Sequence, residues 1–123
     1  MSDYLIAISA QSQYQPDQSS PEEQRYVFAY TITIENRGTR SARLLDRYWL
    51  ITDANGRVQE VRGQGVVGEQ PHLRPGEAFR YTSGAVLSTP LGSMRGYYGM
   101  IGDDGTRFEA SIPVFSLIST RLH

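Results

Sequence analysis

The feature that most constrains the fold is a regular alternation of side chains between residues 26 and 35. Every second position holds an aromatic or branched aliphatic residue: Tyr26, Phe28, Tyr30, Ile32 and Ile34. The residues between them from Ala29 onward are small or polar. Successive side chains of a strand point to opposite faces of a sheet. The segment is therefore predicted to be a β-strand with one buried face and one more polar face.

Shorter alternating runs, separated by turn residues, recur along the chain. They predict strands at residues 4–8, 42–52, 58–61, 77–82, 94–101 and 106–112. Pro113 is expected to limit further pairing, which leaves residues 114–117 as a final or edge segment. Asn55-Gly56 is a typical hairpin turn. Residues 9–24 are polar, contain two prolines, and are predicted to form a long loop.

These runs predict an all-β fold for one domain that spans residues 1–123. About seven or eight antiparallel strands on such a chain are typical of an immunoglobulin-like (fibronectin type III-like) β-sandwich. No window shows a helical period, so we expect minimal helix. Residues 1–24 would supply the N-terminal strand and an acidic loop, because they include four acidic residues and no basic one.

The lone tryptophan, Trp49, lies in the middle of the predicted strand 42–52. We predict that it fills the core between the two sheets; an exposed aromatic in a binding groove is the alternative. Both faces of this strand mix charged and apolar side chains, with Arg47 two residues before Trp49 and Asp46 two before Tyr48. The sequence therefore leaves the facing of this strand open.

The composition favours a globular intracellular protein. Apolar residues make up 39% and charged residues 20%, which argues against a disordered chain. The absence of cysteine excludes disulfides and thiolate metal sites and suits a reducing cytoplasm. The first residues lack the pattern of a signal peptide. No apolar stretch approaches the roughly 20 residues that a membrane-spanning helix needs, so we expect no membrane partner.

All twelve basic residues are arginine. Arginine is favoured where a planar fork contacts a carboxylate or phosphate, but a genome rich in G and C gives the same bias. The formal net charge is −1, and the excess of arginine after residue 24 is small. This argues against a nucleic-acid partner. Exposed edge strands allow either a monomer or a weak dimer.

The spacing Gly63-x-Gly65-x-x-Gly68 matches the dinucleotide-binding fingerprint in letters. That fingerprint needs a helix directly after the glycines to hold the pyrophosphate. Here Pro71 and Pro75 prevent such a helix. A Rossmann site is therefore rejected.

A glycine-rich loop can still present backbone N–H groups to an anion. The candidate ligand-binding residues are Arg62, Gly63, Gln64, Gly65, Gly68, His72 and Arg74. The alternative is structural, because glycines also permit a bulge or a crossover between sheets. The sequence allows both interpretations.

We expect no catalytic residues, no metal site and no cofactor. The two histidines are His72, in a loop bounded by prolines, and His123, the last residue. The acidic pairs Glu22-Glu23 and Asp103-Asp104 lie in a predicted loop and a predicted turn. A protein-interaction surface is a further possibility. Its candidates are Met94, Tyr97, Tyr98, Met100 and Phe115, with at least one of the adjacent tyrosines in the core.

The segment from residue 26 to 115 resembles the bacterial ApaG family (DUF525). The matching stretches are residues 28–36, 47–53, 61–71, 73–76, 94–98 and 112–115. The most specific is Val61-Arg62-Gly63-Gln64-Gly65-Val66-Val67-Gly68. The resemblance covers nearly the whole chain.

This resemblance implies a fibronectin type III-like sandwich and an association with cobalt resistance and magnesium efflux. Family genes often lie beside one for a diadenosine tetraphosphate hydrolase. Related domains in eukaryotic F-box and DNA-polymerase-associated proteins look like interaction modules. The glycine motif has prompted the idea of phosphate binding, and the family brings no catalytic residues.

We therefore expect a non-enzymatic binding module. It would recognise a protein partner, a phosphate or pyrophosphate ligand near residues 62–74, or both. The alternative is an enzyme or accessory factor that acts on phosphoanhydride substrates such as dinucleoside polyphosphates.

Overall fold

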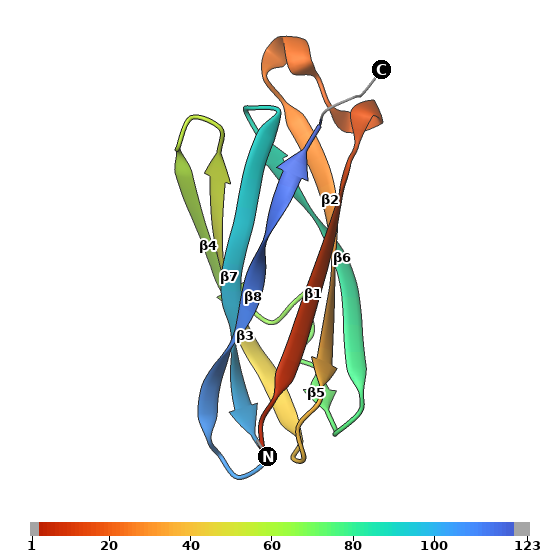
Figure 1. Ribbon diagram of the computed structural model, residues 1–123, viewed down its shortest axis with the longest axis vertical. Coiled ribbons are helices and arrows are strands. Elements are labelled where there is room, and N and C mark those ends of the chain that lie inside the picture. Colours follow the sequence, from red (N-terminus) through yellow and green to blue (C-terminus); the bar gives the residue numbers. More distant parts are fainter. Residues whose placement is uncertain (1–2, 120–123) are drawn as a thin grey trace.

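A computed structural model describes residues 3–119. Its strands are β1 (Ile6–Tyr14), β2 (Tyr26–Asn36), β3 (Ala42–Asp53), β4 (Val58–Gln64), β5 (His72–Leu73), β6 (Ala78–Leu87), β7 (Leu91–Gly102) and β8 (Arg107–Ile118) (Figure 1). Two short 3₁₀ helices, Pro16–Gln18 and Pro21–Glu23, follow β1. The described part of the chain contains no α-helix.

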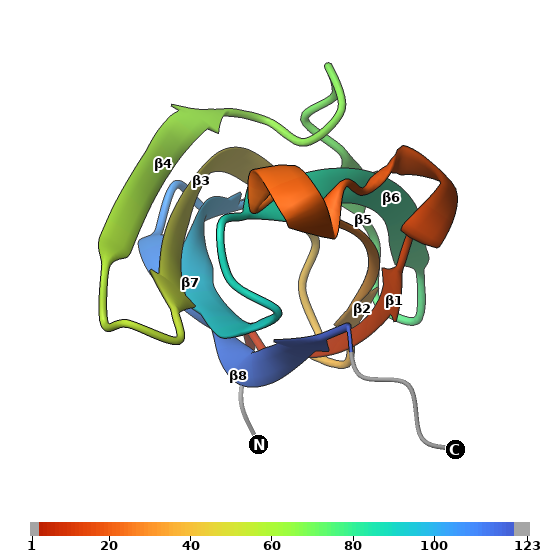
Figure 2. The same ribbon diagram turned by 90° about the horizontal axis from the view of Figure 1, so that it is seen from above.

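The strands form two antiparallel sheets. The smaller sheet has the order β1-β2-β6, and the larger has the order β4-β3-β7-β8 with β5 paired to β3. Viewed along the long axis, the sheets enclose the core, with β1 beside β8 on one side (Figure 2). There Ser12 Oγ donates to the carbonyl of Ser116 at 2.6 Å. On the other side β4 and β6 stand apart (Figure 2). The predicted sandwich is confirmed, and it has one closed side and one open side.

The alternating segment behaves as predicted in β2. Phe28, Ile32 and Ile34 are fully buried, and Tyr30 is 6% exposed. The strand lies between its two neighbours, with Ile34 opposite Ile8 of β1 and Phe79 of β6. The centre of the smaller sheet therefore supplies one wall of the core.

A β-bulge explains why the facing of β3 could not be derived. The pairing of β3 with β7 shifts between Leu44 and Asp46. Before the shift Leu44 is buried, and after it Trp49 and Ile51 are buried. One extra residue moves the inward face from even to odd positions.

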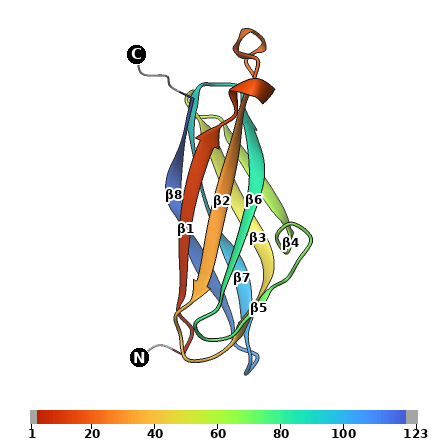
Figure 3. The same cartoon turned by 90° about the vertical axis from the view of Figure 1, so that its right-hand side faces the viewer.

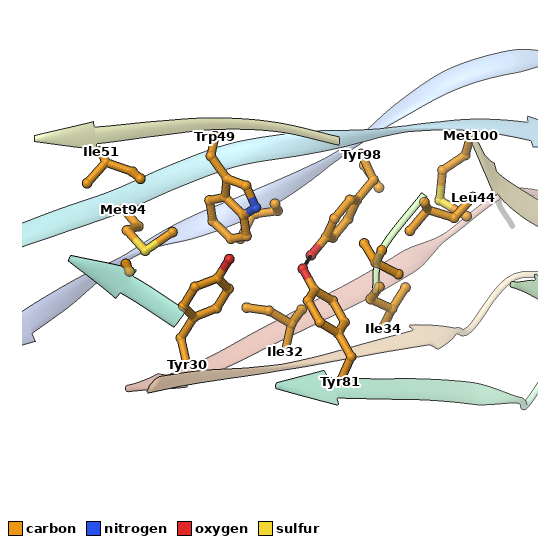
Figure 4. Close-up of a cluster of buried hydrophobic side chains, with 14 of the residues drawn as sticks. Tyr30, Ile32, Ile34, Leu44, Trp49, Ile51, Tyr81, Met94, Tyr98 and Met100 are labelled. Carbon is orange, nitrogen blue, oxygen red and sulfur yellow. Dashed lines mark hydrogen bonds between the residues drawn. The ribbon is translucent and has the colours of Figure 1, made fainter. Parts of the chain in front are cut away.

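Trp49 lies in the core, as predicted, and is 2% exposed. Its ring centroid lies 5.4 Å from that of Tyr30 on the opposite sheet and 5.9 Å from that of Phe115. Figure 4 shows this cluster between the two sheets. The tryptophan thus joins the two inner faces.

The prediction of a loop over residues 9–24 is wrong in its first part. Strand β1 continues to Tyr14, and its inward positions Ala10 and Tyr14 pack against the core. The small Ala10 and the polar Ser12 interrupt the apolar alternation, so the predicted strand ended too early. Pro16 and Pro21 each begin a 3₁₀ helix in the remainder.

The prediction that Pro113 limits further pairing is also wrong, whereas residues 114–117 do belong to an edge strand, as expected. Strand β8 runs through it, and the pairing with β7 shifts between Met94 and Gly96. Gly96 lies opposite Ile112 while Met94 lies opposite Phe115, so the extra residue falls next to the proline. A bulge tolerates a residue without an N–H group.

Candidate functional site

The chain makes a tight turn just after β4, within the predicted ligand loop. The N–H of Val66 donates to the carbonyl of Glu69 at 2.8 Å, and the N–H of Glu69 donates back at 2.9 Å. Between them Val67 has φ +43° and Gly68 has φ +81°. Two successive residues with positive φ are the pattern of a type I′ turn. Gly68 is therefore required by the turn itself.

Gly65 is needed for a close backbone approach. Its φ is +65°, and a Cβ there would lie 2.4 Å from the carbonyl oxygen of Glu69. Its N–H donates to the carbonyl of Leu45 at 2.8 Å. The N–H groups of Gly65, Val66 and Glu69 are thus all used within the protein.

Arg47 is the residue of this region that sequence reasoning missed. It lies opposite Gly63 in the β3–β4 pair, and its Nη1 donates to the carbonyls of Gln64 at 3.0 Å and Gly65 at 2.9 Å. A Cβ at Gly63 would lie 2.6 Å from Nη2 of Arg47. Gly63 therefore leaves room for the guanidinium group. The sequence did contain a signal for Arg47. This arginine lies two residues before Trp49 on the same strand, so both side chains point to the same face, and a buried Trp49 places the charge of Arg47 between the sheets.

The structure brings together only part of the predicted ligand set. Arg62, Gly63 and Gln64 line a hollow of about 670 Å³ on the outer face of the larger sheet, here called the sheet hollow. His72 and Arg74 do not line it. His72 is exposed on β5, opposite Arg43.

Arg74 has a local partner in Glu77. Its Nη2 lies 3.1 Å from Oε2 of that residue, and its backbone N–H donates to Oε1 at 2.8 Å. These hydrogen bonds, the backbone one first, lower the pKa of the Glu77 carboxyl. Arg74 thus stabilises its own turn.

Two tyrosines form the central wall of the sheet hollow. Tyr48 of β3 and Tyr97 of β7 are paired across the sheet and stack with ring centroids 5.0 Å apart. The guanidinium carbon of Arg62 lies 4.4 Å from the centroid of the Tyr48 ring. The hydroxyl of Tyr48 donates to Oε2 of Glu60 at 2.5 Å, which raises the pKa of Tyr48. The three side chains form one ordered stack across β4, β3 and β7.

Charged residues of both signs surround this stack. Asp46, Arg62, Arg107 and Glu109 all line the sheet hollow. Within residues 3–119, neither Arg62 nor Arg107 forms a salt bridge. Their charges are available to a ligand or a partner.

The predicted interaction patch is mostly interior. Met94, Tyr98 and Met100 are each at most 1% exposed, and Phe115 is half-buried against the core. Only Tyr97 lies on the outer face of the sheet. Tyr98 confirms the expectation that one of the two adjacent tyrosines lies in the core. The prediction is wrong for Met94, Met100 and Phe115, because their inward positions follow from the pairing of β7 and β8.

In Figure 3, β1 and β8 run along one side of the molecule and β4 lies on the other. A second, smaller hollow lies on that open side, lined by residues of β4, β6 and the strands next to them. This inter-sheet pocket has a volume of about 320 Å³ and is lined in part by Tyr30, Arg47, Gln64, Tyr81 and Ser83. Arg47 and Gln64 line both hollows. They therefore separate the outer face from the interior.

Behind this pocket the two sheets share a buried hydrogen bond. The hydroxyls of Tyr81 and Tyr98 lie 2.5 Å apart (Figure 4), and burial raises the pKa of both groups. Nε1 of Trp49 is buried and has no acceptor among the described residues. This part of the core is thus rich in hydrogen-bond donors.

The model of the ApaG domain (DUF525) matches residues 16–102 of this chain. The chain belongs to the ApaG family. A curated ApaG protein from Thiobacillus denitrificans is 58% identical over 97% of this chain and 94% of its own length. One from Pseudomonas paraeruginosa is 58% identical over 93% and 90%. The crystal structure of a protein described as the putative ApaA protein from Bordetella pertussis has a TM-score of 0.95 at 50% identity, over 98% of both chains.

Two further findings concern metals and membranes. Within residues 3–119 of this ApaG protein, no three His, Cys, Asp or Glu residues are grouped closely enough to hold a metal ion. In the same residues no helix has the length and apolar character to cross a membrane. His123 lies outside the described residues.

Proposed function

We propose that this ApaG protein is a non-enzymatic binding module that contacts a protein partner through the outer face of the larger sheet. The observation that carries the proposal is the ordered stack of Arg62, Tyr48 and Tyr97 beside the sheet hollow. Tyrosine and arginine, with tryptophan, are enriched among the residues that dominate binding near the centre of protein interfaces. Charges of both signs around the stack suit a polar rim.

The stack is held in place before a partner arrives. Tyr48 and Tyr97 belong to β3 and β7, which are both central strands of the sheet. The hydrogen bond from Tyr48 to Glu60 holds the middle ring of the stack. Side chains that are already ordered lose less conformational entropy on binding.

Immobilised wild-type protein and the variants Arg62→Glu and Tyr97→Ser test this proposal, with bound proteins quantified by mass spectrometry. The control is Arg80→Glu, an exposed arginine on β6 of the other sheet. A partner should be retained by wild type and Arg80→Glu and lost from both hollow variants. The purified partner should then bind the hollow variants at least about tenfold more weakly in calorimetry. A partner that binds all four proteins equally contradicts the proposal.

A small phosphorylated ligand is the second candidate for the same hollow. Its support is that Arg62 and Arg107 have no carboxylate partner within residues 3–119. Asp46 and Glu109, which also line the hollow, oppose a dense negative charge. The protein partner is therefore the leading proposal.

Amide NMR titrations with pyrophosphate and diadenosine tetraphosphate distinguish two positions for such a ligand. Binding that weakens in Arg62→Ala and Arg107→Ala, and persists in Arg74→Ala, would support the sheet hollow. Binding that weakens in Arg62→Ala and Arg74→Ala would support the loop site expected from the sequence. In both cases affinity should fall as salt rises.

An enzyme that acts on phosphoanhydride bonds makes a different prediction. Diadenosine tetraphosphate should then be hydrolysed with magnesium or cobalt present, and loss of turnover in a carboxylate variant would support it. We also propose a cytoplasmic location and a link to cobalt and magnesium homeostasis, by family resemblance alone. Cell fractionation and growth of a deletion strain on cobalt test these two points.

A further inference from the structure

The guanidinium group of Arg47 has unused hydrogen-bonding capacity. Its Nη1 is occupied by the carbonyls of Gln64 and Gly65. Within residues 3–119 its Nε and Nη2 donate to no protein atom, and neither is sealed from solvent. Arg47 also forms no salt bridge with any described residue. These N–H groups, open to solvent, are therefore free to donate to an anionic ligand.

The inter-sheet pocket next to this cation is lined by donors. Tyr30, Tyr81 and Ser83, which carry hydroxyl groups, line it, and no aspartate or glutamate among the described residues does. Burial raises the pKa of Tyr30, and the positive charge of Arg47 opposes that rise. Arg47 thus lines the inter-sheet pocket as well as the sheet hollow.

We propose that the inter-sheet pocket binds the carboxylate group of a small organic acid, with Arg47 as its counter-ion. A guanidinium group offers parallel N–H donors that match the two oxygens of a carboxylate. One cation balances one carboxylate. A phosphate or diphosphate carries more charge, and the remaining polar side chains of the pocket, Tyr30, Gln64, Tyr81 and Ser83, are neutral.

The size of the pocket limits the ligand. Its volume of about 320 Å³ is at the lower end for small-molecule sites. The turn at Val66–Glu69 forms part of its wall, because Val66, Val67 and Gly68 also line it. The ligand is therefore a short acid. This inference does not depend on the proposed protein partner, which would occupy the other face of the sheet.

The test is an amide NMR titration with sodium propionate at constant ionic strength. Saturable shifts should appear at Gly65, Val66, Gly68 and Ser83. The neutral isostere propionamide and inorganic phosphate should each cause much smaller shifts there. Equal effects of propionamide or phosphate would overturn the proposal, and so would the absence of saturable shifts with propionate.

Arg47→Gln and its matched control Arg43→Gln locate the site. Arg43 also donates from Nη1 to a loop carbonyl, that of Gln70 at 2.8 Å, but it does not line the pocket. The propionate dissociation constant should rise by about tenfold or more in Arg47→Gln and stay unchanged in Arg43→Gln. Equal changes in both variants would overturn the proposal.

Gly63→Ala keeps the test valid should Arg47→Gln fail to fold. The added methyl group displaces the guanidinium and leaves its charge in the protein. Propionate binding should weaken as in Arg47→Gln. Wild-type affinity in a folded Gly63→Ala protein would contradict the role of Arg47.

Discussion

At the scale of single residues, the conformation of Val67 is the least usual in the described chain. A β-branched residue with positive φ is rare, because its side chain clashes with the neighbouring backbone. The side chain of Val67 is 56% exposed, so packing gives little in return. The turn carries this strain in the wall of the inter-sheet pocket.

Replacing Val67 with asparagine should relieve the strain. Val67→Asn creates an Asn-Gly pair, the preferred sequence of a type I′ turn. We expect an increase in the free energy of unfolding of about 1 kcal/mol, measured by urea denaturation. Val58→Asn is the control, since Val58 is equally exposed, at 57%, but lies within a strand. Equal or lower stability of Val67→Asn would show that the valine is not strained.

Gly96 illustrates the opposite case, a residue that cannot gain an atom. A Cβ at Gly96 would lie within van der Waals overlap of the backbone carbonyl oxygen of Tyr48, 1.9 Å away. Gly96→Ala should therefore destabilise the protein by about 3 kcal/mol or more. In Gly84→Ala the nearest neighbour of the new atom would lie 3.6 Å away. This control variant should therefore have a melting temperature close to that of wild type, with both variants measured by thermal unfolding. Similar melting temperatures for both would contradict the close approach.

At the scale of elements, the two bulges decide which residues face the core. The pairing shifts between Leu44 and Asp46 and between Met94 and Gly96, and each shift reverses the alternation along one strand. Alternation alone predicted β2 correctly, because β2 is paired without a shift on both sides. The facing of β3 and the continuation of β8 through Pro113 depend on pairing between distant segments. The pairing of segments that are distant along the chain cannot be derived from a single sequence.

The same limit applies to the candidate site. The glycine motif drew attention to Arg62, Gly63 and Gln64, which do line the sheet hollow. Arg47, Tyr97 and Arg107 come from β3, β7 and β8, and only the register of the sheet brings them to the same place. His72 and Arg74 are near the motif in sequence but line no hollow with it.

A cluster of polar side chains ties the segment before β1 to the β7–β8 turn. The hydroxyl of Tyr4 donates to Oδ1 of Asp104 at 2.5 Å, and Arg40 forms salt bridges with Asp103 and Asp104. The hydrogen bond from Tyr4 is the main reason why the pKa of Asp104 is well below its usual value. The ionised form of Asp104 is therefore favoured in the folded protein.

This shift predicts a contribution to stability that depends on pH. A carboxyl group with a lowered pKa in the folded state stabilises above its unfolded pKa of about 3.9, and this stabilisation is lost as the pH falls below it. Asp104→Asn should be less stable than wild type at pH 7, and the difference should shrink toward pH 2 in urea titrations. A difference that stays constant with pH would contradict the assignment. Asp17→Asn, in a 3₁₀ helix, is the control.

At the scale of the whole molecule, the Tyr81–Tyr98 hydrogen bond connects the two sheets through the core. Tyr81 belongs to β6 of the smaller sheet and Tyr98 to β7 of the larger one. Both rings are at most 7% exposed. Each hydroxyl thus satisfies the other where water has little access.

Removing one of the two hydroxyl groups should lower the free energy of unfolding by more than the net contribution of the hydrogen bond. Tyr81→Phe or Tyr98→Phe leaves the other hydroxyl buried without its partner, so we expect a loss of about 1–3 kcal/mol for each. The double variant should lose less than the sum of the two, as measured by chemical denaturation in a double-mutant cycle. Strictly additive losses would contradict a direct bond between the sheets.

Because β1 contacts β8, the sandwich should resist opening more strongly along that side than along the opposite side, where β4 and β6 are the edge strands. Partial opening between β4 and β6 breaks fewer contacts between the sheets than partial opening between β1 and β8. Native-state hydrogen exchange should therefore be faster for outward-facing amides of β4 and β6 than for those of β1 and β8. A ligand would enter the inter-sheet pocket by the same partial opening, while β1 and β8 stay in contact.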